Sequence, residues 1–178
     1  VAYELRGVCR YLIASPAEIM AAGMPFFDIA HDLLGEPNYE AICSDFYNYY
    51  VNNKSAPYGA IAVTRCSELE KLAEIVKKIN ASAIELTQKV QFYDGYNPHI
   101  FYDLGDYIAA ICDDAKLLDE FNSQMLLCIP YKAHTPQVYV YDFGLIPVKK
   151  YSGLSTSAPS TNSKCISYGE TAWRKATQ

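Results

Sequence analysis

The segment Y-G-A-I-A-V-T-R-C-S-E-L-E-K-L-A-E-I-V, residues 58–76, contains the clearest succession of secondary structure in the chain. Residues 58–64 form a short apolar run, which is typical of a buried strand. Ser67 follows, with Glu70 three residues later, and this pair predicts a capping box at the start of a helix. Apolar residues then recur in steps of three and four at Leu69, Leu72, Val76, Ile79, Ala83, Leu86 and Val90. The segment therefore predicts a buried strand followed by an amphipathic helix of about six turns.

The same alternation is predicted along the rest of the chain. Residues 11–14, Y-L-I-A, form a second apolar run that ends at Ser15-Pro16, which suits a buried strand followed by a loop. Helical spacing and capping residues predict helices at 26–34 before Gly35, at 38–52, at 104–112 after Asp103, from Asp113 or Asp114 to 127, and at 170–176. Further strands are predicted at 127–131, 138–141 and 151–155, and loops at 92–98 and 157–164.

Buried strands separated by amphipathic helices indicate an α/β fold in layers, with a mainly parallel sheet flanked by helices. The sequence has no internal repeat and no linker, so we expect residues 1–178 to form a single unit. The chain opens on V-A-Y-E-L-R, residues 1–6, a helical pattern without a capping residue at its start. We therefore expect the carboxy-terminal piece of something longer, processed or truncated, whose sheet is completed by an upstream segment or a companion chain.

Composition limits the classes of partner. The chain has 178 residues, of which 51% are hydrophobic, so it can bury a sizeable core. It carries 20 acidic and 15 basic residues, a net charge of −5, and no run of Lys and Arg interleaved with aromatic residues. We therefore expect no nucleic-acid partner. No apolar run approaches the ~20 residues of a membrane span, so none is expected.

The six cysteines and three histidines form no motif of known chemistry. The cysteines are widely spread, without C-x-x-C or Cys/His ligand spacing, so no metal site is predicted and free thiols are expected. Cys9 precedes a predicted strand rather than following it, and Cys43 lies within a predicted helix. Neither position suits a nucleophile beside a histidine. The remaining cysteines and the histidines are Cys66, Cys112, Cys128, Cys165, His31, His99 and His134, and no catalytic residue is predicted among them.

Six blocks, taken in order, resemble the clostripain family of cysteine peptidases. They are V-A-Y-E-L-R at 1–6, Y-L-I-A-S-P-A-E at 11–18, G-M-P-F at 23–26, Y-D-L-G-D-Y at 102–107, Y-S-G-L-S-T at 151–156 and T-A-W-R-K-A-T at 171–177. Each block is short, but the ordered set spans nearly the whole chain.

The resemblance implies a caspase-like α/β fold and a Cys–His dyad that cleaves peptide bonds after Arg or Lys. In the family the nucleophile lies in an Asp-Ala-Cys motif at a strand end, followed by the helix that V-A-Y-E-L-R continues, and the histidine lies further upstream. Neither motif occurs in this sequence. The resemblance therefore implies a companion N-terminal chain or segment that carries the dyad, and a peptide or protein substrate. It implies no cofactor, leaves calcium dependence open, and suggests secretion or a place in a bacterial cell envelope.

The resemblance also selects three candidates for substrate binding: Ser15, Glu18 and Met24. It puts their loop at the carboxyl end of the strand beside the catalytic one, and ligands bind at that edge of a parallel sheet. A cationic side chain that enters a pocket needs a carboxylate, and Glu18 is the nearest acid on the loop. The segment Ala21-Ala22-Gly23 supplies no acid, and this departs from what the resemblance implies for relatives specific for basic residues. The alternative interpretation is that Glu18 caps a turn.

A second hypothesis belongs to another class: a non-catalytic relative that binds peptides or completes a scaffold. The spacing of Asp103 and Asp106 fits a helix cap better than a catalytic carboxylate pair. Residues 152–155 lack the G-x-S-x-G order of a nucleophile elbow and indicate a strand with a tight backbone approach near the cleft. A copurifying polypeptide with Asp-Ala-Cys and a histidine would favour the peptidase.

Overall fold

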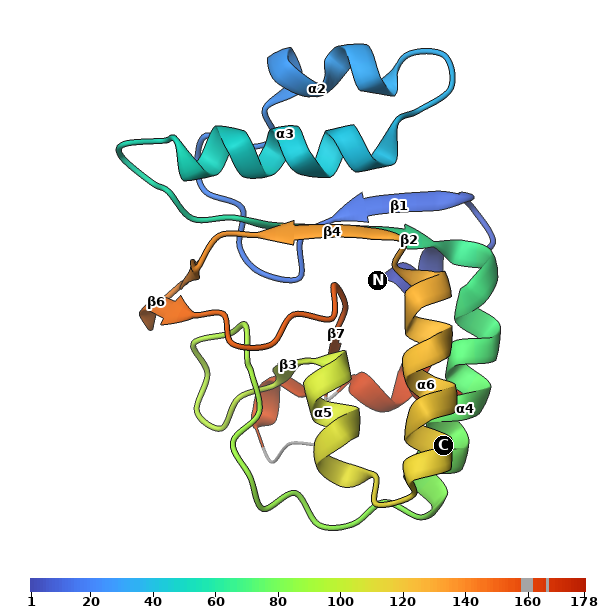
Figure 1. The fold of residues 1–178 in the computed structure, drawn as a ribbon. Helices are drawn as coiled ribbons and strands as arrows, with labels where there is room; N and C mark the ends of the chain where they lie inside the picture. Colours follow the sequence, from blue (N-terminus) through green and yellow to red (C-terminus); the bar gives the residue numbers. More distant parts are fainter. Residues whose placement is uncertain (158–161, 166) are drawn as a thin grey trace.

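A three-stranded sheet runs through the centre of the molecule, in the order β1 (Tyr11–Ala14), β2 (Ala60–Arg65) and β4 (Tyr131–His134) (Figure 1). The structure is a computed structural model, and it describes residues 1–157, 162–165 and 167–178. The first five residues of β2 are buried. A central strand covered on both faces requires the continuous apolar run that residues 60–64 supply.

Both pairs of neighbouring strands in this sheet are antiparallel. Leu12 lies opposite Thr64 in the first pair, and Ala62 lies opposite Lys132 in the second. The strands paired in the other described sheets are antiparallel too. The α/β character predicted from the sequence is confirmed, but the prediction of a mainly parallel sheet is wrong for the described residues.

The helices between the strands explain the antiparallel pairing. The connection from β1 to β2 contains α2 (Phe26–Leu33) and α3 (Tyr39–Val51), which run in opposite directions and return the chain to the end at which β1 stopped (Figure 1). The connection from β2 to β4 uses α4 (Leu69–Ala81) and α6 (Ala115–Cys128) in the same way. A parallel pair would instead need a crossover connection that carries the chain back to the end of the sheet at which the first strand began.

Alternate residues of β2 contact different layers. Ile61 and Val63 pack against Phe46 and Tyr50 of α3, which covers one face of the sheet. Ala62 points to the other face and belongs to the main core, in which the apolar sides of α4, α5 (Leu104–Ile111) and α6 meet. The period of two along β2 therefore divides the core into a layer under α3 and a layer beneath the sheet.

Several predicted helix ends are confirmed by their capping contacts. Asn38 accepts a hydrogen bond from the N–H of Ala41 at the start of α3, and Asp103 accepts one from Asp106 at the start of α5. Asp114, rather than Asp113, caps α6. Gly35, which follows α2, has the positive φ of 74° expected of a terminating glycine.

The predicted helix from Ser67 to Val90 differs from the observed one at both ends. Its first turn is a 3₁₀ turn, Cys66–Glu68, and the Ser67 hydroxyl contacts the neighbouring Glu68 side chain instead of capping α4. α4 ends at Ala81, and the N–H of Ile84 then donates to the carbonyl of Ile111 in α5. The predicted capping box is therefore wrong, and tertiary packing ends the helix earlier than its periodicity indicates.

Several of the shorter strands are displaced from their predicted positions. The hairpin β5 (Gln137–Val140) and β6 (Gly144–Pro147) contains the strand predicted at 138–141. β3 (Phe101–Asp103) pairs with β7 (Ser155–Ser157), so the strand predicted at 151–155 begins late. The strand predicted at 127–131 is displaced as well, because α6 continues to Cys128 and β4 begins only at Tyr131. Of the loop predicted at 157–164, residues 158–161 lie outside the described residues.

The first and last helices of the chain contact each other. α1 (Ala2–Leu5) contacts α7 (Ala172–Thr177), where the ring of Tyr3 meets the ring of Trp173 edge-on, with centroids 5.4 Å apart.

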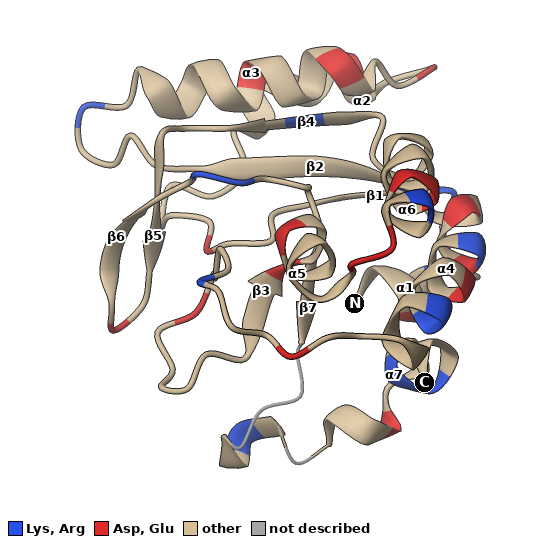
Figure 2. Cartoon of the chain, turned by 60° about the horizontal axis from the view of Figure 1, so that its bottom comes forward, with Lys and Arg blue, Asp and Glu red and all other residues tan. Residues whose placement is uncertain are grey.

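Acidic and basic residues alternate along the outer face of α4 (Figure 2). In the described part of the chain, no helix is long and apolar enough to cross a membrane.

Candidate substrate-binding site

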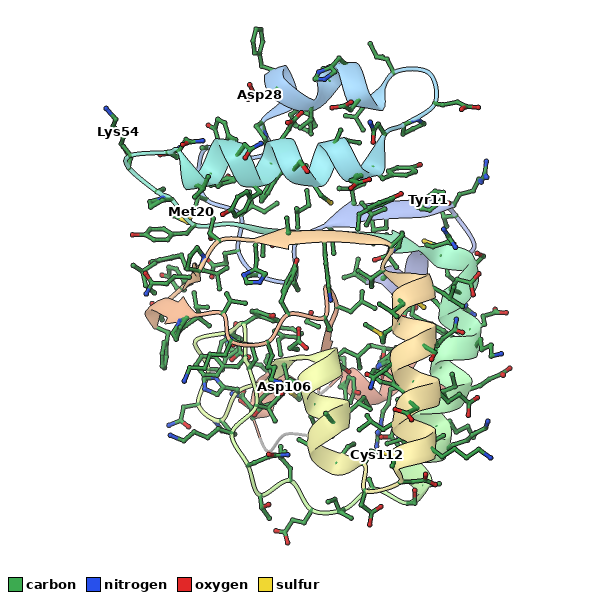
Figure 3. The ribbon with its side chains drawn as sticks, in the orientation of Figure 1. Tyr11, Met20, Asp28, Lys54, Asp106 and Cys112 are labelled. Carbon is green, nitrogen blue, oxygen red and sulfur yellow. The ribbon has the colours of Figure 1, made fainter. Side chains whose placement is uncertain are left out.

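The loop that follows β1, residues 15–25, is anchored to the body of the protein at several points. The hydroxyl of Ser15 accepts a hydrogen bond from the N–H of Ala17, 3.1 Å away, which closes a local turn. The Tyr50 hydroxyl of α3 donates to the carbonyl of Gly23 at 2.7 Å. Met20 and Met24 pack against the apolar cluster under α3, and Figure 3 shows Met20 below the carboxyl end of that helix. The loop is therefore ordered by this chain's own contacts.

Glu18 joins the same loop to the β5–β6 hairpin. Its Oε1 accepts a hydrogen bond from the N–H of Tyr141 at 2.7 Å, and the side chain is otherwise exposed. Ala17, next to it, packs against the apolar cluster that the hairpin contributes. Among the described residues we find no hydrogen bond to Oε2 of Glu18. One carboxylate oxygen thus fixes the loop to the hairpin, and the negative charge stays at the surface.

A cavity of 360 Å³ lies beside the loop, between the sheet and the carboxy-terminal part of the chain. Leu12, Ala14 and Thr64 line it from the sheet, and Trp173 lines it from α7. Ser15 also lines it, whereas Glu18 and Met24 do not belong to its wall. The structure therefore distributes the three candidate residues over a cavity wall, a surface hairpin contact and a core cluster.

The tight backbone approach expected at residues 152–155 is present, although it is not part of a strand. Gly153 is buried, with a φ of 94°, and lies directly against the sheet. A Cβ at this position would come within 2.8 Å of Ile129 and 3.0 Å of Ala62. The next residues, 154–157, form one wall of the cavity. Absence of a side chain at residue 153 therefore sets how close this wall lies to the sheet.

Thr156 and Trp173 belong to this region although neither was predicted to lie there. The indole Nε1 of Trp173 donates to the Thr156 hydroxyl at 3.2 Å, and both residues line the cavity. Glu4 supplies a further link, since its Oε1 accepts from the backbone N–H of Trp173 at 3.3 Å. A single tryptophan near the end of the chain was the available signal, but its partners come from distant segments.

The thiols and imidazoles are each engaged separately. Burial raises the pKa of Cys43 to about 11 and that of Cys128 to about 12, which leaves both thiols protonated at neutral pH. The ring nitrogens of the histidines contact Asp32, Asp94 and the carbonyl of Thr135, from His31, His99 and His134 respectively. Among the described residues no cysteine sulfur forms a hydrogen bond to a histidine. The described part of this chain therefore contains no assembled Cys–His pair.

One group of side chains between α2 and α3 has the spacing of possible metal ligands. Donor atoms of His31, Asp32 and Asp45 lie within 4.8 Å of one another. An imidazole with two carboxylates suits zinc or manganese better than calcium, which prefers a shell of oxygen ligands. Nε2 of His31 and Oδ2 of Asp32 lie 3.1 Å apart, so a direct contact between these two side chains also explains the close spacing.

The comparisons with known proteins settle the family. The model of the clostripain family matches residues 1–166. This chain belongs to the clostripain family. No curated protein matches it. A solved clostripain from Bacteroides thetaiotaomicron, in complex with the peptide inhibitor BTN-VLTK-AOMK, is 43% identical with a TM-score of 0.94, and the match covers 99% of this chain and 80% of that chain.

Two further clostripain-family structures extend the comparison. The secreted C11 cysteine protease "iotapain" from Bacteroides thetaiotaomicron is 43% identical with a TM-score of 0.95. An inactive zymogen C11 protease from Parabacteroides distasonis is 30% identical with a TM-score of 0.85. Each match covers 99% of this chain, but this chain spans only 51% and 54% of those two chains. The resemblance of the six sequence blocks to the clostripain family is confirmed. The α/β fold of this cysteine-protease family is confirmed as well.

Proposed function

We propose that this chain is the carboxy-terminal part of a clostripain-like cysteine endopeptidase that cleaves after Arg or Lys. The observation that supports this most directly is the 43% identity and TM-score of 0.94 to a clostripain crystallised with a peptide inhibitor whose peptide letters end in K, lysine. The similarity extends over 99% of this chain. The secreted description of a second relative supports secretion of this protein as well.

The catalytic dyad is proposed to lie on a companion segment or chain. The support for this placement comes from the thiols of this chain: burial keeps Cys43 and Cys128 protonated, and no described cysteine forms a hydrogen bond to a histidine. A cysteine peptidase needs a thiolate to attack the scissile carbonyl and an imidazolium to protonate the leaving amine. In the proposal the companion supplies both groups and the backbone N–H donors that hold the oxyanion.

This chain is proposed to supply one wall of the substrate pocket. Ser15 lines the cavity beside the sheet, and Glu18 holds a negative charge at the surface of the adjoining loop. A carboxylate there would offset the hydration that an Arg or Lys side chain loses on entering a pocket. Met24 is proposed to act through the loop conformation, because its side chain packs under α3.

An irreversible affinity label tests the placement of the dyad. The purified enzyme, with any chain that copurifies, is treated with a lysine peptide carrying an acyloxymethyl ketone, and the labelled cysteine is located by peptide mass spectrometry. We expect one labelled cysteine, on a companion polypeptide. A label on any cysteine of residues 1–178 would overturn that placement.

Peptide substrates test the specificity in the same preparation. Matched peptides that differ only in the residue before the scissile bond, Arg, Lys or a neutral residue, should be turned over in favour of the two basic ones. Equal turnover of neutral peptides would reject the basic preference while keeping the peptidase. No label and no turnover with any peptide would favour the non-catalytic, peptide-binding or structural alternative.

A further inference from the structure

Two of the six cysteines lie in direct contact although they are 57 residues apart in sequence. The Sγ atoms of Cys9 and Cys66 are separated by 3.7 Å. Cys9 lies in the irregular stretch between α1 and β1, and Cys66 begins the 3₁₀ turn after β2. The backbone holds the two segments together, since the N–H of Cys66 donates to the carbonyl of Arg10 at 3.0 Å. The main-chain segments that carry the two sulfurs are thus joined directly beside the β1–β2 ladder.

We propose that Cys9 and Cys66 form a reversible intrachain disulfide when the protein meets a disulfide oxidant such as oxidised glutathione. A disulfide requires an S–S distance of about 2.05 Å, so the sulfurs need to approach by under about 2 Å. Cys9 precedes β1 and makes no ladder contact, so side-chain rotation and a small local shift can supply that movement. This inference does not depend on the proposed peptidase activity.

The two thiols differ in accessibility, which sets the order of the reaction. Cys66 is 1% exposed, and burial, with a further contribution from Cys9, raises the pKa of its thiol to about 11. Cys9 is only half-buried, and the neighbouring Val8 is 81% exposed. Cys9 is therefore the thiol that a dissolved oxidant reaches first.

The exchange proceeds in two balanced steps. The Cys9 thiol loses its proton to solvent, and the resulting thiolate attacks one sulfur of oxidised glutathione, so that the other glutathione leaves as a thiolate. Cys66 then loses its proton and attacks the Cys9 sulfur of the mixed disulfide, which expels the first glutathione. The protein loses two electrons and two protons, and the oxidant is reduced to two thiols. Proximity of the sulfurs compensates for the low acidity of Cys66 in the second step.

The remaining cysteines have no comparable partner in the described part of the chain. Cys43 and Cys128 are buried at 4% and 0% exposure, in different core clusters. The Cys112 sulfur contacts the carbonyl of Asp114 at 3.5 Å. All six thiols are free, and among the described residues the one sulfur–sulfur contact is that between Cys9 and Cys66. The pairing should therefore be specific.

Thiol mapping under controlled oxidation tests the proposal. The purified enzyme, with any copurifying chain, is equilibrated with glutathione at ratios from fully reduced to a hundredfold excess of the oxidised form. It is then alkylated and digested without reduction. On this chain we expect one crosslinked peptide pair, Cys9 with Cys66, and alkylation of the other four cysteines. Two alkylated thiols at positions 9 and 66 under the most oxidising condition would overturn the proposal, as would any other pairing.

Variants separate a real crosslink from adventitious oxidation. Cys9→Ser should abolish the crosslinked pair, and Cys66→Ala, a second route, should leave Cys9 as a glutathione adduct. The control Cys165→Ser should leave the pair intact. In the parent protein oxidation should raise Tm by roughly 5–15 °C, because the crosslink closes a long loop in the unfolded chain. An equal rise in Cys9→Ser would show that the stabilisation has another origin.

Discussion

The carboxylate of Glu18 accepts a hydrogen bond from Tyr141 through Oε1, and it also carries the charge that the proposed substrate pocket requires. Glu18→Gln keeps a carbonyl acceptor for Tyr141 and removes the charge, whereas Glu18→Ala removes both. If Glu18 faces an Arg or Lys side chain, Glu18→Gln should lower kcat/KM for an Arg peptide by roughly two to three decades, with little loss for a neutral peptide.

The alternative, in which Glu18 only fixes the loop to the hairpin, gives a different pattern. Glu18→Gln should then be close to the parent, and Glu18→Ala should lower Tm and reduce turnover of all peptides alike. Glu85→Gln is a matched control, because Glu85 is also exposed and lies outside the loop. Unchanged selectivity in both Glu18 variants would remove this residue from the pocket.

Asp114 and Asp113 offer a second comparison between neighbouring carboxylates. Oδ1 of Asp114 accepts from the N–H groups of Lys116 and Leu117, at 2.9 and 3.0 Å, at the start of α6. Asp114→Ala should therefore reduce the free energy of unfolding by about 0.5–2 kcal/mol. Asp113→Ala, which removes a carboxylate without a cap contact, should cost much less. Urea unfolding of both variants makes the comparison, and equal losses would contradict the assignment of the cap.

At the scale of the elements, Gly153 determines how the segment before β7 meets the sheet. Gly153→Ala adds a Cβ 2.8 Å from Ile129 and imposes a side chain at a φ of 94°. We expect a loss of about 2–4 kcal/mol in unfolding free energy, from overpacking and backbone strain together. Gly35→Ala is the control, since its φ of 74° carries the strain but a Cβ there meets nothing within 4 Å. It should cost about 1 kcal/mol. Similar losses would show that contact with the sheet is unimportant.

Local signals predicted the helices well because a helix is stabilised largely within its own sequence. Asn38, Asp103 and Asp114 each cap a helix at the position that sequence analysis proposed, or at one of the two proposed. The end of α4 was missed because Ile84 leaves the helical pattern for a bond to Ile111, which is distant in sequence. The repeat of apolar residues up to Val90 could not indicate that Ile111 would lie next to Ile84.

Strand directions depended on contacts that no local pattern contains. Whether β1 and β2 run parallel is decided by the two helices between them, whose opposite directions follow from tertiary packing. The candidate site shows the same limit. Sequence reasoning selected the loop with Ser15 and Glu18, but the hairpin at Tyr141 that receives Glu18 lies 123 residues away.

At the scale of the whole molecule, the buried thiols should make the protein less stable at alkaline pH. Burial raises the pKa of Cys43, Cys66 and Cys128 to about 11, 11 and 12, while the same thiols ionise near 9 in the unfolded chain. The unfolded state therefore releases protons first as pH rises. The stabilisation that comes from keeping these thiols protonated is complete below about pH 9. Between pH 9 and 12 the free energy of unfolding falls by up to about 1.4 kcal/mol per pH unit for each thiol.

Urea unfolding under reducing conditions between pH 7.5 and 10.5 measures this effect. Cys43→Ala should unfold at lower urea at every pH, because it leaves a cavity, yet show a shallower decline above pH 9. Cys112→Ala, at a half-buried position, is the control and should keep the parent's slope. A flat profile in the parent would contradict the role of the thiols.

Trp173 has a further use that follows from its position. It is the only tryptophan among 178 residues, its ring touches Tyr3 of α1, and it lines the 360 Å³ cavity. Indole emission shifts to longer wavelength as the surroundings of the ring become wetter. The chain therefore carries a built-in optical reporter. A blue shift in Trp173 emission would register a peptide or chain segment that fills the cavity, and a red shift would register departure of α1, without any added dye.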